Sequence, residues 1–390
     1  MSNNWNVVPF TEAVDICDTF RKPINSSERA SRIKGKEQSE LYPYYGATGQ
    51  VGFIDDYITD GEYVLLGEDG APFLDAFSNK AYIISGKTWV NNHAHVLRSK
   101  TNNKFLCYYL NSFNYKGYVS GTTRLKLTQA EMKRIPVPVP PLSEQERIVS
   151  RIEELFSQLD AGVETLKKTK AQLAVYRQAV LKEAFESVIP ESDTCNVEDV
   201  CKDIKVGIVI KPAQYYTSAD VGVRAFRSAN VREFAVNDSD WVYLTKAGHE
   251  ANLRSEIHTG DVLVVRSGYP GTACVVPPTY NGCNAIDILI AVPYAEKILP
   301  EYLCAYTNSP LGKRIIQEKK RGVAQAHFNV SGYSKTPIIV PCLETQKRVV
   351  AEIDSRLSVC DSIEQTVDTA LQQAEAMRQS FLKDAFEGRL

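Results

Sequence analysis

The sequence predicts an α/β (α+β) protein in which two mixed α/β domains are separated by two long, antiparallel coiled-coil helices that arise from an internal duplication. The first observation is a segment that occurs twice, at 136–186 and at 337–387, and the two copies align without a gap with 19 identities over 51 positions. The second observation is that the stretches ahead of the two copies have similar lengths but different sequences. A repeated scaffold with two unlike heads indicates a protein that reads two different things at a fixed separation.

The domain boundaries follow from this alternation. We expect a first variable domain at 1–141, a first long helix at 142–188, a second variable domain at 189–341 and a second long helix at 342–390. A chain of 390 residues is long enough for two or three domains with cores of their own.

The first variable domain reads as short strands between Gly, Asn and Asp turns, followed by one helix. The expected strands are 41–53, 63–66, 81–85 and 95–97, and the expected helix is 105–112. The second variable domain has the same outline, with strands at 241–245, 261–266 and 273–276 and a helix at 300–308. Each domain ends on a proline-bounded strand, at 135–139 and at 337–340.

Each copy of the repeat predicts one long helix. In the first copy, Ser143 and Glu146 follow two prolines and have the spacing of a capping box. Apolar residues then recur at alternating steps of three and four, which is a heptad seam; they are Ile148, Ile152, Leu155, Leu159, Leu166, Leu173, Tyr176 and Val180. A helix of ~45 residues, about 65 Å long, cannot bury such a stripe alone. We expect the two copies to pack against each other; packing on their own domains or on another chain stays open.

Composition and charge narrow the class of protein. The nine cysteines are scattered without a Cys-x-x-Cys pair, which is typical of reduced thiols in a cytoplasmic protein. There is no apolar run of membrane-spanning length and no signal peptide pattern, so no membrane partner is expected. The net charge is only −2, yet residues 80–134 carry ten Lys and Arg against one acid, and residues 311–336 carry six against one. These two basic regions can bind phosphate; the alternative is two solvated faces without a ligand.

If the ligand of these basic regions is DNA, candidate contacts follow from the chemistry of base reading, in which Arg suits guanine, Asn and Gln suit adenine, and Lys and hydroxyl groups hold phosphates. In the first domain the candidates lie in the segments 86–93 and 120–126 and are Lys87, Thr88, Asn91, Asn92, His93, Thr122, Thr123, Arg124 and Lys126. In the second domain they are Lys211, Tyr215, Tyr216, Arg224, Arg227, Asn230, Arg266, Ser267, Tyr269, Lys319, Lys320, Arg321, Gln325 and His327. An ordinary surface loop is the alternative for any one of them, and Tyr215 or Tyr216 could instead be a core residue.

Motifs for catalysis or metal binding are weak. His93 and His95 share a strand face but lack a third ligand, so we predict no metal site. Glu68 and Asp69 read as an acidic turn and not as catalytic carboxylates, and neither a dinucleotide fingerprint nor a nucleophile elbow occurs. We therefore predict a non-enzymatic reader without a cofactor of its own.

The chain resembles the specificity subunit of Type I restriction–modification enzymes. The resemblance rests on the Pro-x-x-x-Pro-Pro-Leu-x-Glu-Gln entry within 135–145, the helix end Leu-Lys-Glu-Ala-Phe-Glu at 181–186, and the return of both at 337–346 and 382–387. Gly-Ala-Thr-Gly-Gln-Val-Gly at 46–52 and Leu-Leu-Gly-Glu-Asp-Gly-Ala-Pro at 65–72 add to it. The second copy departs from the pattern, with Cys342 in place of the second proline.

The resemblance implies that each variable domain is a target recognition domain that reads one half of a split sequence in double-stranded DNA. It implies that the helices fix the gap, that two methyltransferase subunits using S-adenosylmethionine methylate adenine, and that restriction subunits using ATP and Mg²⁺ cleave. Candidate residues for docking these partners are the repeated Gln145, Gln346, Arg147, Arg348, Arg177 and Arg378. Two alternatives stay open: a coiled-coil protein-binding adaptor without DNA specificity, and an enzyme with an unrecognised acid–base pair.

Overall fold

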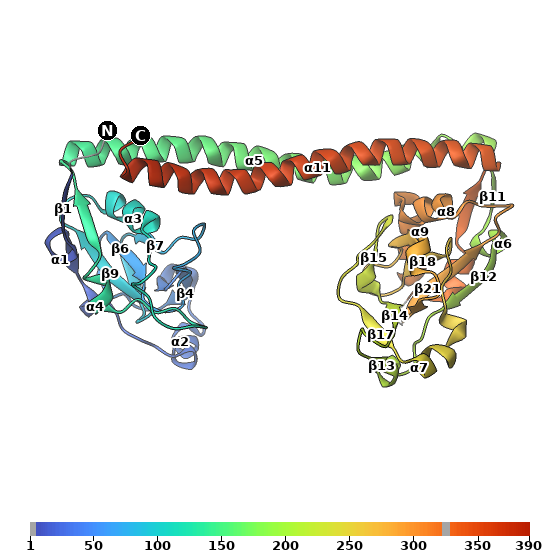
Figure 1. Ribbon diagram of the computed structural model, residues 1–390, viewed down its shortest axis with the longest axis horizontal. Coiled ribbons are helices and arrows are strands. Elements are labelled where there is room, and N and C mark those ends of the chain that lie inside the picture. The colour runs from blue at the N-terminus through green and yellow to red at the C-terminus, as the bar shows by residue number, and fades with distance from the viewer. Residues whose placement is uncertain (1–4, 322–327) are drawn as a thin grey trace. The chain divides into compact units, whose positions relative to one another are not determined.

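The structure is a computed structural model that describes residues 5–321 and 328–390, and it divides into two compact units. Unit 1 comprises Met1–Lys168 with Val367–Leu390, and unit 2 comprises Thr169–Thr366. Helix α5 (Leu142–Glu186) therefore begins in unit 1 and ends in unit 2, while α11 (Leu343–Phe386) begins in unit 2 and ends in unit 1 (Figure 1). The four segments expected from the sequence separate the variable domains from the long helices, whereas the two units each contain parts of both helices. The four-segment division stays a prediction.

The variable domain of unit 1 contains two four-stranded sheets, with strand orders β2-β9-β6-β7 and β4-β3-β8-β5, and β1 pairs with β10. Its strands are β1 (Asn6–Pro9), β2 (Val14–Ile16), β3 (Tyr42–Gly46), β4 (Gly49–Ile54), β5 (Thr59–Asp60), β6 (Tyr63–Gly67), β7 (Ala81–Ile84), β8 (Lys87–Val90), β9 (Ala94–Ser99) and β10 (Pro136–Val139). Its helices are α1 (Phe10–Ala13), α2 (Ser26–Ile33), α3 (Asn103–Ser112) and α4 (Gln129–Met132).

The variable domain of unit 2 repeats this plan with the orders β12-β21-β18-β19 and β13-β17-β14-β20, and β11 pairs with β22. Its strands are β11 (Asp193–Asn196), β12 (Cys201–Val206), β13 (Tyr216–Thr217), β14 (Val223–Phe226), β15 (Val231–Arg232), β16 (Ala235–Val236), β17 (Val242–Leu244), β18 (Val262–Val265), β19 (Ala273–Val275), β20 (Asn284–Ala285), β21 (Ile288–Pro293) and β22 (Pro337–Val340). Its helices are α6 (Val197–Val200), α7 (Lys246–Glu250), α8 (Pro300–Asn308), α9 (Pro310–Arg321) and α10 (Val330–Ser334). The predicted class, two mixed domains with two long helices, is confirmed.

The pairing of the long helices is also confirmed, and the same contact recurs in each unit. In unit 2, Arg177 of α5 donates to Asp361 of α11 at 2.6 Å. In unit 1, Arg378 of α11 pairs with Asp160 of α5. Because the sequence repeat relates Arg177 to Arg378 and Asp160 to Asp361, each copy of the helix supplies the ion-pair partner of the other copy.

The capping box predicted at Ser143 is wrong. Helix α5 already begins at Leu142, and the carbonyl of Pro141 accepts hydrogen bonds from the amides of Glu144 and Gln145. Ser143 therefore lies inside the first turn. Proline at the helix start carries no amide proton to leave unpaired, so the two prolines can begin the helix without a capping side chain.

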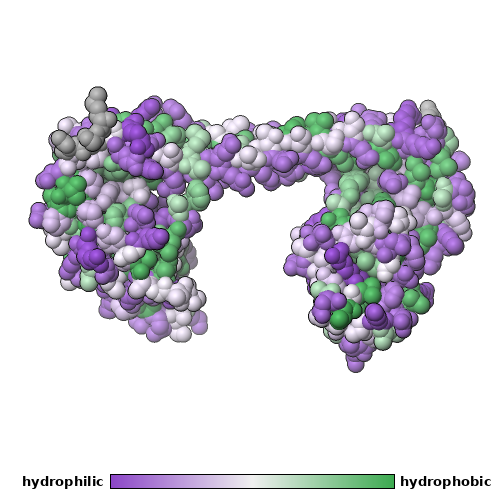
Figure 2. All heavy atoms as spheres, in the orientation of Figure 1, coloured by the Kyte–Doolittle hydropathy of each residue, from purple (hydrophilic) through white to green (hydrophobic). Residues whose placement is uncertain are grey.

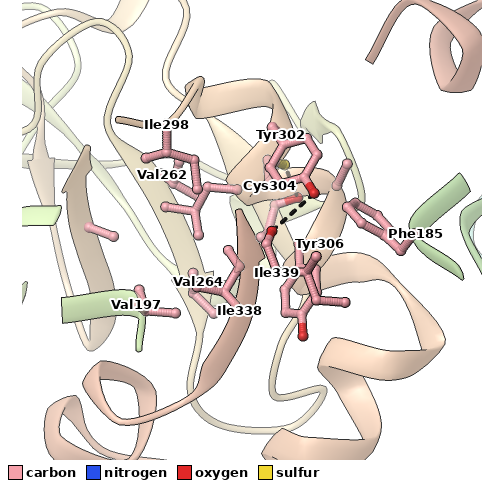
Figure 3. Close-up of a cluster of buried hydrophobic side chains, with 14 of the residues drawn as sticks. Phe185, Val197, Val262, Val264, Ile298, Tyr302, Cys304, Tyr306, Ile338 and Ile339 are labelled. Carbon is pink, nitrogen blue, oxygen red and sulfur yellow. Dashed lines mark hydrogen bonds between the residues drawn. The ribbon is translucent and has the colours of Figure 1, made fainter. Parts of the chain in front are cut away.

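A phenylalanine anchors the end of each long helix: Phe185 is buried and Phe386 is partly buried. Phe185 of α5 packs edge-on against Tyr302 and Tyr306 of α8, with ring centroids 5.2 Å apart in both pairs. Figure 3 shows Phe185 pointing at these two rings, with Tyr302 bonded to the carbonyl of Ile339. Its repeat counterpart, Phe386 of α11, packs in the same way on α3. Full burial of a side chain such as Phe185 contributes about 1.5–3 kcal/mol, so the end of α5 belongs to the core of its domain, and Phe386 packs against the core of unit 1.

The visible surface of the helices is largely hydrophilic and is interrupted by small hydrophobic patches (Figure 2). The exposed apolar residues of the long helices include Val175, Val359 and Met377. Within 5–321 and 328–390, no helix is both long enough and apolar enough to cross a membrane.

Candidate nucleic-acid interface

Three loops of the first variable domain meet beside the end of β6. The amide of Glu68 donates to the carbonyl of His93 at 2.8 Å, the amide of Gly70 donates to Leu125 at 2.9 Å, and the amide of Leu127 donates to Glu68 at 2.7 Å. These bonds fasten the segments 67–70, 91–94 and 120–127 to one another. The two segments that sequence reasoning selected for DNA contact therefore converge on one place, and the acidic turn joins them.

The converging loops line an open cleft of about 730 Å³. Four of the predicted DNA-contacting residues line it, and the acidic turn forms part of its wall. The lining residues are Gly46, Ala47, Thr48, Val51, Asp69, Gly70, Ala71, Pro72, Asn91, His93, Thr123, Arg124 and Leu125. The side chain of Arg124 is 60% exposed, so its guanidinium is available to a ligand in the cleft.

The remaining candidates of the first domain differ in exposure. Lys87, Asn92, Thr122 and Lys126 are exposed, and the ammonium group of Lys87 lies 4.7 Å from the centre of the Tyr57 ring. Thr88 is buried, and its hydroxyl bonds to that of Thr59 at 2.5 Å. Asn91 is also buried, and its side-chain oxygen accepts a hydrogen bond from the amide of His93 at 2.8 Å. Thr88 and Asn91 therefore shape the interface from below, and we leave them out of the contact surface.

A partly buried ionic network supports the loops from beneath. His95 is fully buried, with Nδ1 2.9 Å from Asp18 Oδ2 and Nε2 3.1 Å from the carbonyl oxygen of Leu127. Glu68 pairs with Arg21, and Arg21 lies 3.1 Å from Asp18. Burial opposes ionisation of Asp18, but hydrogen bonds from His95, Val96 and Gln129 outweigh it, so the pKa of Asp18 is lowered.

The two histidines once considered as metal ligands have separate roles. His95 is bonded inside the network, whereas His93 lines the cleft, with Nδ1 3.3 Å from Asp69. Over the described parts of the chain, no group of three His, Cys, Asp or Glu residues could hold a metal ion.

In the second variable domain, a pocket of about 770 Å³ lies between β18, the β15–β16 hairpin and α9. Two predicted residues line it, Ser267 and Tyr269, and Tyr269 is 85% exposed. The pocket also contains polar side chains that sequence reasoning missed: Ser228, Arg232, Glu233, Lys313 and Gln317. Of these, Lys313 and Glu233 form an ion pair.

Other candidates of the second domain lie elsewhere. The guanidinium of Arg224 on β14 lies 5.6 Å from the centre of the Trp241 ring, and hydrogen bonding to Tyr243 raises its pKa. Lys211 and Tyr216 are exposed. Tyr215 is partly buried and packs against a small core cluster, in line with the alternative that one of the two tyrosines is a core residue.

Three further side chains hold the second domain together. Asn230 is fully buried and donates to the carbonyls of Asn237 and Ser239. Arg227 donates to the carbonyl of Asp240, and Arg266 pairs with Asp287 at 3.0 Å. Since each of them makes a hydrogen bond or an ion pair within the domain, these three residues are not part of the surface we propose.

The remaining candidates concern the end of α9 and beyond. Lys319, Lys320 and Arg321 lie in the last turn of α9. The structure does not describe their side chains. Gln325 and His327 lie outside the described residues.

The six residues predicted for partner docking fall into three groups. Gln145 and Gln346 are buried and bonded to their own domains. Arg177 and Arg378 pair with aspartates of the other helix. Arg147 donates to Glu144 and remains 54% exposed, and Arg348 is exposed. Of the six side chains, only those of Arg147 and Arg348 are classed as exposed, and Arg147 is paired with Glu144.

Sequence reasoning missed the part played by Asp69 and Gly70. It predicted an acidic turn at Glu68 and Asp69, but the partners of Asp69 and Gly70, which are Arg124 and Leu125, lie more than fifty positions away. The signal available in the sequence was a glycine at position 70, next to two acidic residues. The structure explains it, because Gly70 has a positive φ of 76°, a conformation that favours glycine.

Comparisons with known proteins agree with one another. Residues 4–174 match the family model described as Type I restriction modification DNA specificity domain. A protein of Haemophilus influenzae assigned as a type I restriction enzyme specificity subunit is 28% identical over 377 residues, which cover 94% of this chain and 91% of that one. The specificity subunit of the Escherichia coli type I enzyme EcoBI is 25% identical, over 92% of this chain and 79% of that one.

Among solved structures, a chain from a study of complex assembly and conformational transition in a type I restriction–modification system has a similar fold. The TM-score is 0.73 at 16% identity, over 100% of this chain and 99% of that one.

Proposed function

We propose, from the premise that this chain belongs to the Type I restriction–modification specificity subunits, that it reads a bipartite DNA target with one variable domain per half-site. Members of this family are the non-catalytic, DNA-recognising component of the enzyme. In this proposal the chain directs adenine methylation and restriction that its partner subunits carry out.

The observation that carries the proposal is the convergence of the predicted contact segments in the first domain. His93, Thr123 and Arg124 line one open cleft, and Lys126 is exposed beside it. Such a set combines a guanidinium for base edges with hydroxyl and ammonium groups for phosphates. In the second domain, Ser267, Tyr269 and Lys313 around the pocket, together with Arg224, are the corresponding candidates.

The long helices support a role in setting the gap between half-sites. A helix of 45 residues is about 68 Å long at 1.5 Å per residue. Half-sites in duplex DNA recur at a helical turn of about 34 Å or its multiples. We propose that the helices act as a spacer, so the number of unread base pairs is constant for a given helix length.

Partner subunits complete the proposed activity. Two methyltransferase subunits would supply S-adenosylmethionine chemistry, and restriction subunits would supply ATP- and Mg²⁺-dependent cleavage. Arg147 and Arg348 are the proposed docking residues, because they are the repeated arginines whose side chains remain at the surface.

The test is a genome-wide map of methylated adenine in cells that carry the methyltransferase partner, with and without this chain. The expected result is a split motif, two short specified halves around a fixed gap, that disappears when the chain is deleted. An unchanged map, with the assembled complex demonstrated by co-purification, would overturn the proposal and favour the adaptor alternative. Salt dependence adds a second discriminator, because phosphate contacts make DNA affinity fall steeply as salt rises.

A further inference from the structure

The acidic turn after β6 places a carboxylate inside the proposed DNA-binding cleft. Asp69 forms an ion pair with the Nη2 atom of Arg124 and faces His93 Nδ1 at 3.3 Å. Its side chain is 25% exposed, compared with 60% for Arg124. A carboxylate in this position repels DNA phosphates and so lowers the affinity for DNA of any sequence. Its presence in the cleft therefore needs another explanation.

The backbone around the ion pair fixes where Arg124 can lie. A Cβ atom added at Gly70 would fall 3.1 Å from Arg124 Nε, so the guanidinium rests directly against the glycine backbone. At the other end of the loop, a Cβ atom at Gly121 would fall 2.4 Å from the Arg124 carbonyl oxygen. The amide of Ser120 donates to Lys126, and the amide of Lys126 donates back to Ser120, which closes the loop. Arg124 is therefore held at its backbone and at its guanidinium.

Stability does not explain the ion pair. A partly exposed pair contributes little to folding, because solvent screens it and two side chains lose freedom. The ion pair has a larger effect on DNA recognition than on folding stability. Arginine has five N–H donors, and guanine is read by two donors aimed together at its O6 and N7 atoms. A guanidinium restrained through Nη2 loses less freedom on binding and keeps a pair of donors for the base.

We propose that Arg124 reads one guanine of the first half-site and that Asp69 is a positioning residue that holds the guanidinium for this contact. The inference rests on the proposed function, since it names the base that one residue of that interface recognises. Gly70 has a part in the same device, because its missing side chain leaves room for the guanidinium.

The experiment uses the full chain co-expressed with its methyltransferase partner, in four forms: unchanged, Arg124→Ala, Asp69→Asn and the control Asp56→Asn. Asp56 is a carboxylate of the same domain that is 59% exposed and lies 3.8 Å from Arg32, not in the cleft. Each complex is used for adenine mapping and for anisotropy measurements on duplexes that carry each of the four base pairs at every position of the first half-site.

Arg124→Ala is expected to lower discrimination at a single G·C position by roughly 5- to 150-fold, the range for one bidentate contact. Asp69→Asn is expected to lower discrimination at the same position by roughly two- to fivefold, the upper range for a partly exposed pair, while affinity for unrelated DNA rises. Asp56→Asn is expected to leave discrimination at that position unchanged. Intact reading of the second half-site in all four forms reports that the chain is folded and assembled.

Each of the following results would overturn the inference. The first is an Arg124-dependent position that is not G·C. The second is an equal rise in affinity for every duplex with Asp69→Asn, which would make the carboxylate a purely electrostatic brake. The third is loss of both half-sites in Asp69→Asn, which would make the residue structural. If the unchanged complex reads no split motif at all, the proposed function fails; if it reads one and Arg124→Ala leaves every position intact, only this inference fails.

Discussion

Replacing Gln346 should destabilise the second unit through lost hydrogen bonds alone. Gln346 is fully buried at the start of α11. Its Nε2 donates to the carbonyls of Lys297 at 2.9 Å and Pro341 at 2.8 Å, and its Oε1 accepts from the amide of Leu299 at 2.9 Å. The Gln346→Met variant keeps the side-chain volume but leaves all three backbone groups without a partner.

The expected size follows from the bond count. Each hydrogen bond contributes about 1 kcal/mol net, so loss of three costs about 3 kcal/mol. The matched variant is Gln145→Met in unit 1. Gln145 donates to the carbonyl of Pro140 and accepts from the hydroxyl of Thr101, which can rotate to another acceptor. Loss of these two bonds should cost about 1–2 kcal/mol. Gln346→Glu should be at least as harmful as Gln346→Met, because a carboxylate cannot donate to two carbonyls.

Hydrogen–deuterium exchange measured by mass spectrometry separates the two units. Gln346→Met should speed exchange of the protected amides at the start of α11 by about 100-fold, the equivalent of roughly 3 kcal/mol in local opening, and leave the start of α5 unchanged. The reasoning is refuted if exchange rises less than about fivefold, or if both helix starts respond equally. Either result would mean that water or backbone movement replaces the lost partners.

Three further predictions concern separate features. The pKa of Asp18 is lowered by its hydrogen bonds to His95 and other groups. Its contribution to stability is therefore present above its unfolded pKa of about 3.9 and is lost as pH falls through the lower folded value. The Asp18→Asn variant should lose less stability than the unchanged chain when denaturant titrations at neutral pH and at pH 3 are compared. Cys342 is exposed and its pKa is lowered by a hydrogen bond with Thr345, so a thiol reagent at neutral pH should label it first, and Cys342→Ser should remove the fast phase seen by peptide mapping. Gly121→Ala would bring a Cβ atom against the carbonyl of Arg124, so first half-site reading should fail while the second is retained in the methylation map; equal retention of both would contradict the close contact.

Local patterns predicted much of the fold. Helix α8 has the same bounds in the sequence prediction and in the structure, 300–308, because Pro300 marks its start and apolar residues recur along it. The long helices were predictable from the repeat and its seam. Strand β21 was missed although it is a continuous apolar run, since such a run at 288–293 can belong to a buried helix as easily as to a buried strand.

The candidate site was less predictable, because its geometry depends on distant partners. Thr88 looks like a DNA-contacting hydroxyl in its own segment, yet Thr59, 29 positions away, takes its hydrogen bond. Gln346 looks like an exposed helix residue, yet the carbonyl of Lys297, 49 positions away, accepts from it. Burial of a polar side chain is decided by tertiary contacts, and a short sequence window does not contain them.

The crossed ion pairs Arg177–Asp361 and Arg378–Asp160 have a consequence for how the recognised sequence can evolve. Two copies of a shorter chain with one head and one helix could form the same pairs. Because the two heads would be identical, the proposed function would then require an inverted repeat as the target. Joining both helices in one polypeptide removes that constraint. Under the proposed function, each head is then free to change its base preference while the scaffold keeps its pairs, so the target can be asymmetric and each half can diverge independently.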